Sequence, residues 1–256
     1  MSIGRKTISV VVPTFNVGKI LSRCLESAKW ADEIIVVDMG STDKTLLISR
    51  AYGAKIIKNI PVDGNFDKNR KLGMLRAKGD WILKLDSDEE LTPKLQVEIK
   101  RILTRDYDEI NGYNIPNRIF MFGSEVKHGF VKSGSHELRL FRNKKWSYAP
   151  FRFHQQIKVE GETGFLKNYY YHYNFNSIAQ FIEKMNRYTS LDSAVLVKES
   201  RIYWFGIFLA PVRTFIKLYF IQFGFLDGRN GLVVSLMFAL YNFVEKIKIW
   251  ELQQKT

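Results

Sequence analysis

The chain has 256 residues, of which 46% are hydrophobic and 25% are charged, a composition typical of a globular protein. Its formal net charge of +13 favours an anionic partner, such as nucleotide phosphates, an anionic membrane surface or a nucleic acid. Because Cys24 is the only cysteine, a disulfide framework within the chain is excluded, and a reducing compartment is expected.

Apolar, β-branched runs alternate with helically spaced segments through the first part of the chain. We expect strands at residues 7–12, 33–38, 54–58 and 81–85, with helices at 17–29, after 45 and at 66–78. The strands are almost continuously apolar, which is typical of strands buried on both faces of a parallel sheet. This order predicts a doubly wound α/β fold with a mostly parallel sheet, in which ligands bind at the carboxyl ends of the strands.

One stretch, residues 79–90, runs from an apolar strand straight into a cluster of carboxylates. Asp86 and Asp88 are two residues apart, so their side chains point to the same side of an extended segment. Two such carboxylates repel each other unless a cation lies between them, and hard oxygen ligands suit Mg²⁺ or Mn²⁺. The alternative is an acidic helix start, because Thr92 and Pro93 are typical helix-opening residues.

Polar residues also follow the first two predicted strands. Pro13, Thr14 and Asn16 come after the first strand, and Asp38 ends the second. Several polar groups are therefore expected at one edge of the sheet. No Gly-x-Gly-x-x-Gly motif and no P-loop follows the first strand, which argues against a Rossmann dehydrogenase and a P-loop enzyme.

Three segments resemble, in order and spacing, the signatures of family 2 glycosyltransferases with the GT-A fold. They are Val-Val-Pro-Thr-Phe-Asn at 11–16, Val-Val-Asp-Met-Gly-Ser-Thr-Asp at 36–43 and Asp-Ser-Asp-Glu at 86–89, and the run 68–81 is similar to the same family. The resemblance implies an enzyme that transfers a sugar from a nucleotide donor, with a UDP-sugar favoured. It also implies a divalent cofactor, Mg²⁺ or Mn²⁺.

The resemblance also suggests a role for each of these residues. In the family, the acidic residue that matches Asp38 accepts a hydrogen bond from the uracil ring, although Asp38 could also cap the following helix. The residue that matches Asp86 faces the ribose or the metal, and the one that matches Asp88 binds the metal. Lys68 and Arg70 either meet the diphosphate or form a solvated basic helix face. The expected nucleotide-sugar-binding residues are Pro13, Thr14, Asn16, Asp38, Lys68, Arg70 and Asp86.

Residues 111–175 look like a second, more irregular layer of strands. The segment 137–142 resembles an Arg-Leu-Phe-Arg strand of a branch that includes lipopolysaccharide core glucosyltransferases. Inverting transfer needs a general base near the acceptor hydroxyl, and we expect Glu137 in this role because it begins that strand. The other candidates are His136, Glu125 and His154.

Two departures from these relatives affect the choice of base. Where they often show an aspartate before the Arg-Leu-Phe-Arg strand, residues 132–135 are Lys-Ser-Gly-Ser. Where they often show His-Glu, this chain has His154 and Gln155. His154 is a candidate metal ligand, and a phosphate contact or a structural histidine are the alternatives for it.

The pattern becomes helical from residue 177. Two uncharged runs, 202–212 and 231–244, contain 11 and 14 residues and fall short of the roughly 20 apolar residues of a spanning helix. Arg213 and Lys217 interrupt the first segment, and residues 200–256 carry seven Lys/Arg against three Asp/Glu. This pattern suits an amphipathic helix in the membrane interface. A helical pair packed on the catalytic domain and a dimer interface are the alternatives.

We therefore expect a GT-A catalytic domain at residues 1–175 and a helical, membrane-associating region at 176–256. Within the catalytic domain, residues 1–105 form the nucleotide-binding half and 106–175 the acceptor half. The resemblance implies peripheral attachment to the cytoplasmic face of the inner membrane.

The expected reaction is inverting transfer from a UDP-sugar, UDP-glucose favoured. The acceptor would be a membrane-held glycolipid or lipid-linked saccharide of bacterial lipopolysaccharide or cell-envelope synthesis. One alternative is a polyprenyl-phosphate glycosyltransferase, whose phosphate acceptor needs no strong base. The other is a basic nucleic-acid-binding protein, but the basic residues are spread along the chain and no nucleic-acid-binding motif occurs.

Overall fold

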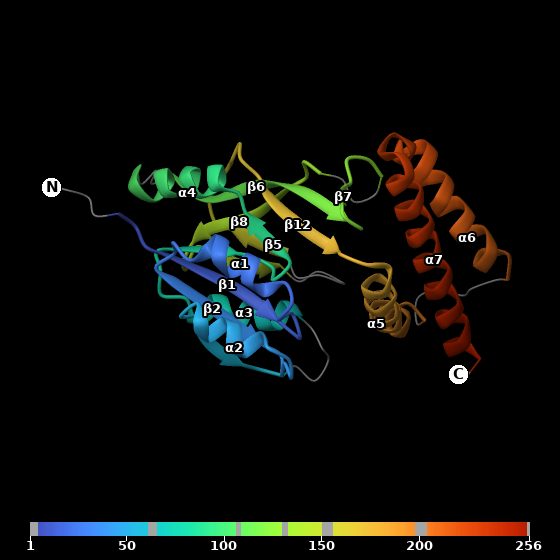
Figure 1. Ribbon diagram of the computed structural model, residues 1–256, viewed down its shortest axis with the longest axis horizontal. Helices are drawn as coiled ribbons and strands as arrows, with labels where there is room; N and C mark the ends of the chain where they lie inside the picture. Colours follow the sequence, from blue (N-terminus) through green and yellow to red (C-terminus); the bar gives the residue numbers. More distant parts are fainter. Residues whose placement is uncertain are drawn as a thin grey trace. The chain divides into compact units, whose positions relative to one another are not determined.

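The computed structural model describes residues 5–60, 66–105, 109–129, 133–149, 156–197 and 204–254. The chain forms two compact units (Figure 1). The first unit comprises residues 1–117 and 135–172, and the second comprises 118–134 and 173–256. The second unit thus takes in a segment from the predicted acceptor half, and the predicted division at residue 175 stays a prediction.

Four parallel strands lie in the predicted nucleotide-binding half of the first unit, in the order β3-β2-β1-β4. They are β1 (Ile8–Thr14), β2 (Glu33–Asp38), β3 (Lys55–Lys58) and β4 (Trp81–Lys84). Every residue of β1 is buried, as its continuous apolar run predicts for a central strand. The four strands predicted from the sequence are confirmed.

The strands of the second half extend this sheet rather than forming a layer of their own, because β8 pairs with β4 in antiparallel fashion. From β4 the order continues β8-β6-β12-β5, and β11 pairs with β6. Their bounds are β5 (Glu89–Leu91), β6 (Ile110–Met121), β8 (His136–Arg142), β11 (Glu162–Phe165) and β12 (Tyr170–Phe175). A separate hairpin joins β9 (Trp146–Ala149) and β10 (Gln156–Val159).

Helices cover both faces of the parallel strands. On one face α1 (Leu21–Ala28), α2 (Thr45–Ala51) and α4 (Pro93–Arg105) pack on the larger core, and on the other α3 (Phe66–Arg76) packs with the β9–β10 hairpin. Successive side chains of β1 point to opposite faces of the sheet and so contribute to both hydrophobic cores. Val10 and Val12 belong to the larger core, and Val11 belongs to the core beneath α3. A Cβ on Gly73 would lie 2.5 Å from Val11 Cγ1, so this glycine lets α3 approach the sheet closely.

The parallel register brings the predicted polar residues to one edge of the sheet. Thr14 pairs with Asp38 at the carboxyl ends of β1 and β2. Beyond the end of β4, Leu85 N–H still donates to the Val11 carbonyl, so Asp86 leaves the sheet beside β1. This edge is where ligands bind in doubly wound folds.

The second unit consists mainly of helices, as the sequence predicts. It contains β7 (Ser124–Glu125), α5 (Ile178–Leu196), α6 (Trp204–Ile216), a π-helical turn (Lys217–Ile221), a 3-10 turn (Gly224–Asp227) and α7 (Gly228–Gln253). α6 and α7 form an antiparallel hairpin, with the rings of Trp204 and Trp250 5.3 Å apart and those of Phe208 and Phe243 6.4 Å apart (Figure 1).

The helical stretch Trp204–Ile221 is longer than the uncharged run in the sequence, because the π-helical turn continues α6 past Arg213 and Lys217. It has 18 residues, and 11% of it is buried. Within the described part of the chain, it is the one helix whose length and composition would allow it to cross a membrane.

Candidate active site

The loops after β1 and β2 are tied together by the polar residues predicted to bind the nucleotide. The fully buried Asp38 carboxylate accepts hydrogen bonds from the Thr14 hydroxyl at 3.3 Å and from the N–H groups of Gly40 and Ser41 at 3.0 Å each. The Asn16 side-chain oxygen accepts from the Thr42 N–H at 2.9 Å. Thr14, Asn16 and Asp38 therefore lie together at the strand ends, in a preformed turn.

The alternative role of Asp38, capping the next helix, belongs to a different residue. Asp43 accepts hydrogen bonds from the N–H and the hydroxyl of Thr45, the first residue of α2. Asp38 instead holds the turn at Gly40 and Ser41. Pro13 lies within β1, one residue before Thr14, and its side chain is buried.

Arg70 and Asp86 form an ion pair at the end of β4. The Arg70 Nη2 atom lies 2.6 Å from Asp86 Oδ1, and Nη1 binds Asp67 one turn earlier on α3. Arg70 is therefore held inside the site and is not part of a solvated helix face, whereas Lys68 is exposed on α3. Burial alone would raise the pKa of Asp86, but Arg70 and Arg139 outweigh it and hold that pKa well below its usual range.

Arg139, on β8, connects three carboxylates. Its side chain is 4% exposed, and Nη2 lies 2.8 Å from Glu89 Oε1 and 2.7 Å from Glu137 Oε2. Nη1 donates to Glu89 Oε2 at 2.9 Å and lies 3.5 Å from Asp86 Oδ2. The guanidinium also lies over the Tyr170 ring, 4.9 Å from its centroid. The buried Arg139 guanidinium thus connects Asp86 and Glu89, which follow β4, with Glu137 on β8, the strand predicted to carry the general base.

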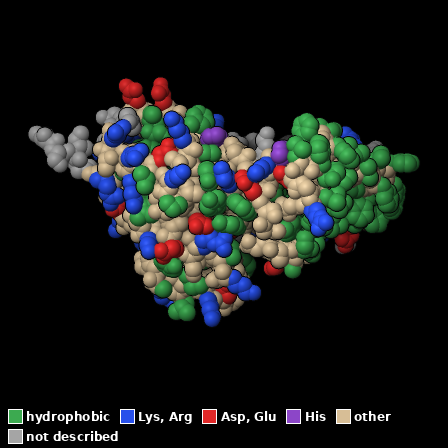
Figure 2. All heavy atoms as spheres, turned by 45° about the horizontal axis from the view of Figure 1, so that its top comes forward, with side chains coloured by type: hydrophobic (Ala, Val, Ile, Leu, Met, Phe, Trp, Pro, Cys, Tyr) green, Lys and Arg blue, Asp and Glu red, His purple; other side chains and the backbone are tan. Residues whose placement is uncertain are grey.

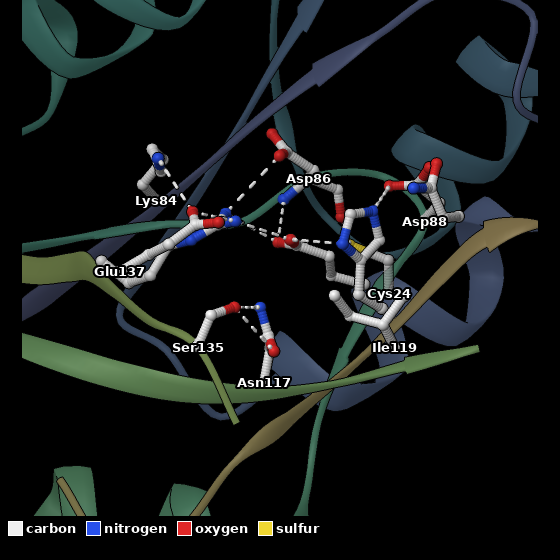
Figure 3. Close-up of polar contacts among 12 residues, drawn as sticks. Cys24, Lys84, Asp86, Asp88, Asn117, Ile119, Ser135 and Glu137 are labelled. Atoms are coloured by element: carbon white, nitrogen blue, oxygen red, sulfur yellow. Dashed lines mark hydrogen bonds and ion pairs between the residues drawn. The ribbon is translucent and has the colours of Figure 1, made fainter. Parts of the chain in front are cut away.

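Glu137 lies beside two cations and remains accessible. Its side chain is 45% exposed, and Lys84 Nζ lies 3.9 Å from its Oε2 atom. Figure 3 shows Lys84, Asp86 and Glu137 directed toward one another. The Arg139 guanidinium holds the pKa of Glu137 below its ordinary value, and burial with nearby Arg139 and Arg70 lowers the pKa of Lys84 to about 8. Glu137 is therefore ionised at neutral pH.

Asp88 and His172 lie together on the other side of Glu89. His172 Nε2 is 3.6 Å from Asp88 Oδ1, and its Nδ1 atom is 3.9 Å from Glu89 Oε1. The β5–β12 pairing produces this arrangement, because it sets His172 opposite Glu89. Burial raises the pKa of the Glu89 carboxyl above its ordinary value, although Arg139 opposes the rise.

A divalent cation at this place would find a carboxylate at Asp88, which suits Mg²⁺ or Mn²⁺, and an imidazole at His172, which transition-metal ions accept more readily than Mg²⁺ does. Among the described residues, no group of three or more His, Cys, Asp and Glu side chains is arranged to hold a metal. His154, the predicted additional ligand, lies outside the described residues.

Residues 9–188, about 70% of the chain, match the family model for glycosyl transferase family 2. The chain belongs to this family. The glycosyltransferase is 31% identical over 263 residues to an uncharacterized glycosyltransferase of Rickettsia typhi, covering 98% of this chain and 89% of that protein. It is 25% identical over 256 residues to a lipopolysaccharide core biosynthesis glycosyltransferase of Rhizobium meliloti, covering 95% and 92%.

Among solved structures, the glycosyltransferase is similar to S. aureus TarS 1-349 in complex with UDP. The two are 18% identical, the match covers 97% of this chain and 91% of that chain, and the TM-score is 0.49. The family assignment and the α/β GT-A fold predicted from the sequence are confirmed.

The residues just before β8, where the resemblance leads us to expect an aspartate, form polar contacts of their own. Ser135 exchanges hydrogen bonds with Asn117, whose amide donates to the Ser135 hydroxyl at 2.9 Å. Glu137 and Arg139 are two residues apart on β8 and so share one face of the strand, and Ser135 precedes its first residue. The ion pairs around Arg139 form a cluster of charged side chains, which we call the ionic cluster: Arg70, Lys84, Asp86, Glu89, Glu137, Arg139 and His172. Of the described base candidates, only Glu137 belongs to it. His136 packs edge-on against Phe165, and Glu125 pairs with Arg118 in the second unit.

Four members of the cluster were not singled out from the sequence: Lys84, Glu89, Arg139 and His172. Lys84 did carry a signal, since it is a lone charge inside an apolar strand. Glu89 and Arg139 lie in segments that resemble the family, but local spacing does not show their pairing, which joins positions 50 residues apart. His172 is brought to the site by the pairing of β12 with β5, which the sequence pattern does not show.

Proposed function

We propose that this glycosyltransferase uses a divalent cation to transfer a sugar, with inversion, from a UDP-sugar to a membrane-held glycolipid or lipid-linked saccharide. The observation that carries the proposal is that Asp38, Asp86 and Asp88 follow or end β2 and β4, the parallel strands on either side of β1, at the same edge of the sheet and next to the cluster that holds Glu137. The donor site and a carboxylate suited to the acceptor thus belong to one compact unit.

The donor is assigned to the edge formed by β1, β2 and β4. Asp38, fixed by Thr14 and the following turn, is the proposed uracil contact, and Asn16 lies in the adjoining loop. Arg70, held by Asp86, is the proposed diphosphate contact, with Lys68 on the same helix. The resemblance to lipopolysaccharide core glucosyltransferases favours UDP-glucose.

Asp88 and His172 are the proposed protein ligands of Mg²⁺ or Mn²⁺. A partial protein ligand set suits these ions, because they keep several waters and are commonly completed by substrate phosphate oxygens. When bound, the cation would offset the negative charge that develops on the departing diphosphate. Asp86 stays a proposed ribose or metal contact from the same loop, and its carboxylate also fixes Arg70.

Glu137 is the proposed general base. Arg139 and Lys84 orient its carboxylate, and its exposed fraction leaves it within reach of an acceptor hydroxyl. It also lies two residues after Ser135, close to the position where the resemblance leads us to expect an aspartate. Its lowered pKa makes it a weaker base than an unpaired carboxylate but keeps it in the ionised form.

Exchanging Glu137 for glutamine tests this role. We expect Glu137→Gln to reduce kcat by about 10²- to 10⁴-fold, because the amide cannot take the proton, while binding of UDP-glucose is unchanged. The assay is transfer of labelled glucose to a lipopolysaccharide-core glycolipid, with Glu125→Gln as the control for a carboxylate outside the cluster. Unchanged kcat in Glu137→Gln would exclude Glu137 as the base.

A polyprenyl-phosphate acceptor is the second candidate, and the cations at the site favour it. Lys84 Nζ lies 3.9 Å from Glu137, Arg139 and Arg70 lie near Lys84, and an acceptor phosphate needs no base. This alternative predicts that Glu137→Gln still glucosylates polyprenyl phosphate in vesicles at the wild-type rate.

With either acceptor the enzyme is proposed to be peripheral on the cytoplasmic face of the inner membrane, and the lipopolysaccharide-core function of the Rhizobium meliloti relative supports this location.

A further inference from the structure

An exposed apolar stripe runs along α6. Five large side chains recur at intervals of three or four residues and so share one side of the helix, and each is between 44% and 81% exposed. They are Phe205, Phe208, Leu209, Val212 and Ile216. The opposite side faces α7, where Ile207 is almost fully buried, and Phe208, at the edge of the stripe, also contacts the Phe243 ring of α7. A soluble helix would show polar residues on the side where α6 shows these five.

The stripe continues onto the tip of the α6–α7 hairpin, where the turns between the helices expose five more apolar residues. These are Phe220, Ile221, Phe223, Phe225 and Leu226, each 42% to 66% exposed. Figure 2 shows the hydrophobic side chains gathered over the C-terminal helices. We call the stripe and the tip residues together the apolar seat.

Basic residues border the apolar seat. Arg213 and Lys217 are exposed, are four residues apart, and lie about one quarter to one third of a turn from the centre of the stripe. Arg229 is exposed at the start of α7. Cations beside an apolar face match the boundary between acyl chains and anionic headgroups.

The tip of the hairpin is fastened to another part of the same unit. The buried Asp227 carboxylate accepts hydrogen bonds from the N–H groups of Lys127 and His128 and lies 2.8 Å from His128 Nδ1. The Gly129 N–H donates to the Gln222 carbonyl at 3.0 Å. If α6 crossed a bilayer, the tip would have to carry residues 127–129 with it or break these bonds.

The position of Arg213 also disfavours a spanning orientation. It is the tenth residue of the stretch Trp204–Ile221, so in a spanning helix it would lie near the bilayer centre, where arginine is poorly tolerated. In a helix that lies flat, Arg213 and Lys217 remain at headgroup level while the stripe reaches the acyl chains.

We infer that α6 lies parallel to the membrane surface, within one leaflet that contains anionic lipids, with the apolar seat buried in the interface. This inference deepens the proposed function, because it specifies how the enzyme is held at the membrane that carries its acceptor. The occupant of the seat is a lipid leaflet, and the hairpin does not cross it.

Single spin labels along the stripe test the orientation. Cys24 is buried, so cysteines introduced as Phe205→Cys, Val212→Cys or Ile216→Cys are the reactive thiols in the full chain. Positions 205 and 216 are about 16 Å apart along the helix axis. In phosphatidylcholine–phosphatidylglycerol vesicles, relaxation by oxygen and by a water-soluble nickel complex gives the depth of each label. Glu183→Cys, exposed on α5, is the control position.

We expect the three stripe labels at the same shallow depth and the Glu183→Cys label in water. Depths that change steadily across the bilayer would contradict the flat orientation. Labels that stay in water would contradict burial of the apolar seat in the membrane interface. Protection of the labels without lipid, together with a dimer in light scattering, would assign the face to a second copy and also overturn it. UDP binding is measured on the same variants. A variant that binds UDP but shows the wrong label depth contradicts only the membrane orientation, whereas absence of UDP binding contradicts the proposed function.

The basic border gives a second test. Arg213→Gln with Lys217→Gln should weaken binding to anionic vesicles about tenfold or more and leave the weaker binding to neutral vesicles unchanged. Lys29→Gln with Arg50→Gln removes two exposed charges elsewhere and serves as the matched control. Equal losses in both pairs would contradict a local role for Arg213 and Lys217.

Discussion

Replacing Asp88 with asparagine should reduce sugar transfer about a thousandfold or more while the protein stays folded. The amide keeps the shape of the side chain but removes the negative charge that the proposed cation needs, and a bound cation is worth several kcal/mol in the transition state. The measurement is kcat with UDP-glucose and Mn²⁺, together with the urea midpoint of the variant.

Glu90→Gln is the matched control, because Glu90 belongs to the same acidic run but is partly exposed and lies 4.0 Å from Arg23. We expect it to transfer at the wild-type rate. His172→Gln should weaken Mn²⁺ binding and leave the fold intact. Turnover in Asp88→Asn equal to that of the wild type would refute the metal role of this carboxylate.

Replacing Arg139 with methionine should destabilise the protein by about 3–5 kcal/mol. The change removes the buried partner of Glu89, so this carboxyl must either stay charged in the protein interior without a cation or take up a proton, next to Asp86. Urea unfolding at neutral pH measures the loss. A cost below about 1 kcal/mol would show that the cluster tolerates the loss of Arg139.

A double variant separates the structural role of Arg139 from its positioning role. When Arg139→Met is combined with Glu89→Met, both buried charges are gone, and most of the stability should return. Transfer should not return, because Asp86 and Glu137 still lack the guanidinium that orients them. If the double variant regained the wild-type kcat, Arg139 would have no positioning role, and the cluster would be purely structural.

The fold of residues 1–105 could be predicted because its strands carry their own sequence signals. The apolar runs of β1, β2 and β4 are buried on both faces, and their ends carry the motifs that resemble family 2. A parallel register then places Asp38 and Asp86 at one edge without further information. Local pattern and function agree in this part of the chain.

The acceptor half was less predictable, because its arrangement depends on pairings between distant segments. β8 joins the sheet next to β4, and this pairing brings Arg139 of β8 into contact with Glu89 and Asp86. The pairing of β12 with β5 likewise brings His172 to Asp88. No local spacing encodes contacts of this kind. The C-terminal helices were predicted from their periodicity, but the π-helical turn that lengthens α6 was not.

The most direct test of the account is a thermal-shift measurement with UDP, GDP, CMP and ADP, each with and without Mn²⁺. A ligand that binds the folded state at 100 times its Kd adds about 2.7 kcal/mol, which is a rise in Tm of roughly 5 °C or more for a chain of this size. We expect this rise with UDP only when Mn²⁺ is present, and its loss in Asp88→Asn. An equal rise without the metal, a rise with GDP instead, or no rise with any nucleotide would contradict a metal-dependent UDP-sugar site at Asp38, Asp86 and Asp88.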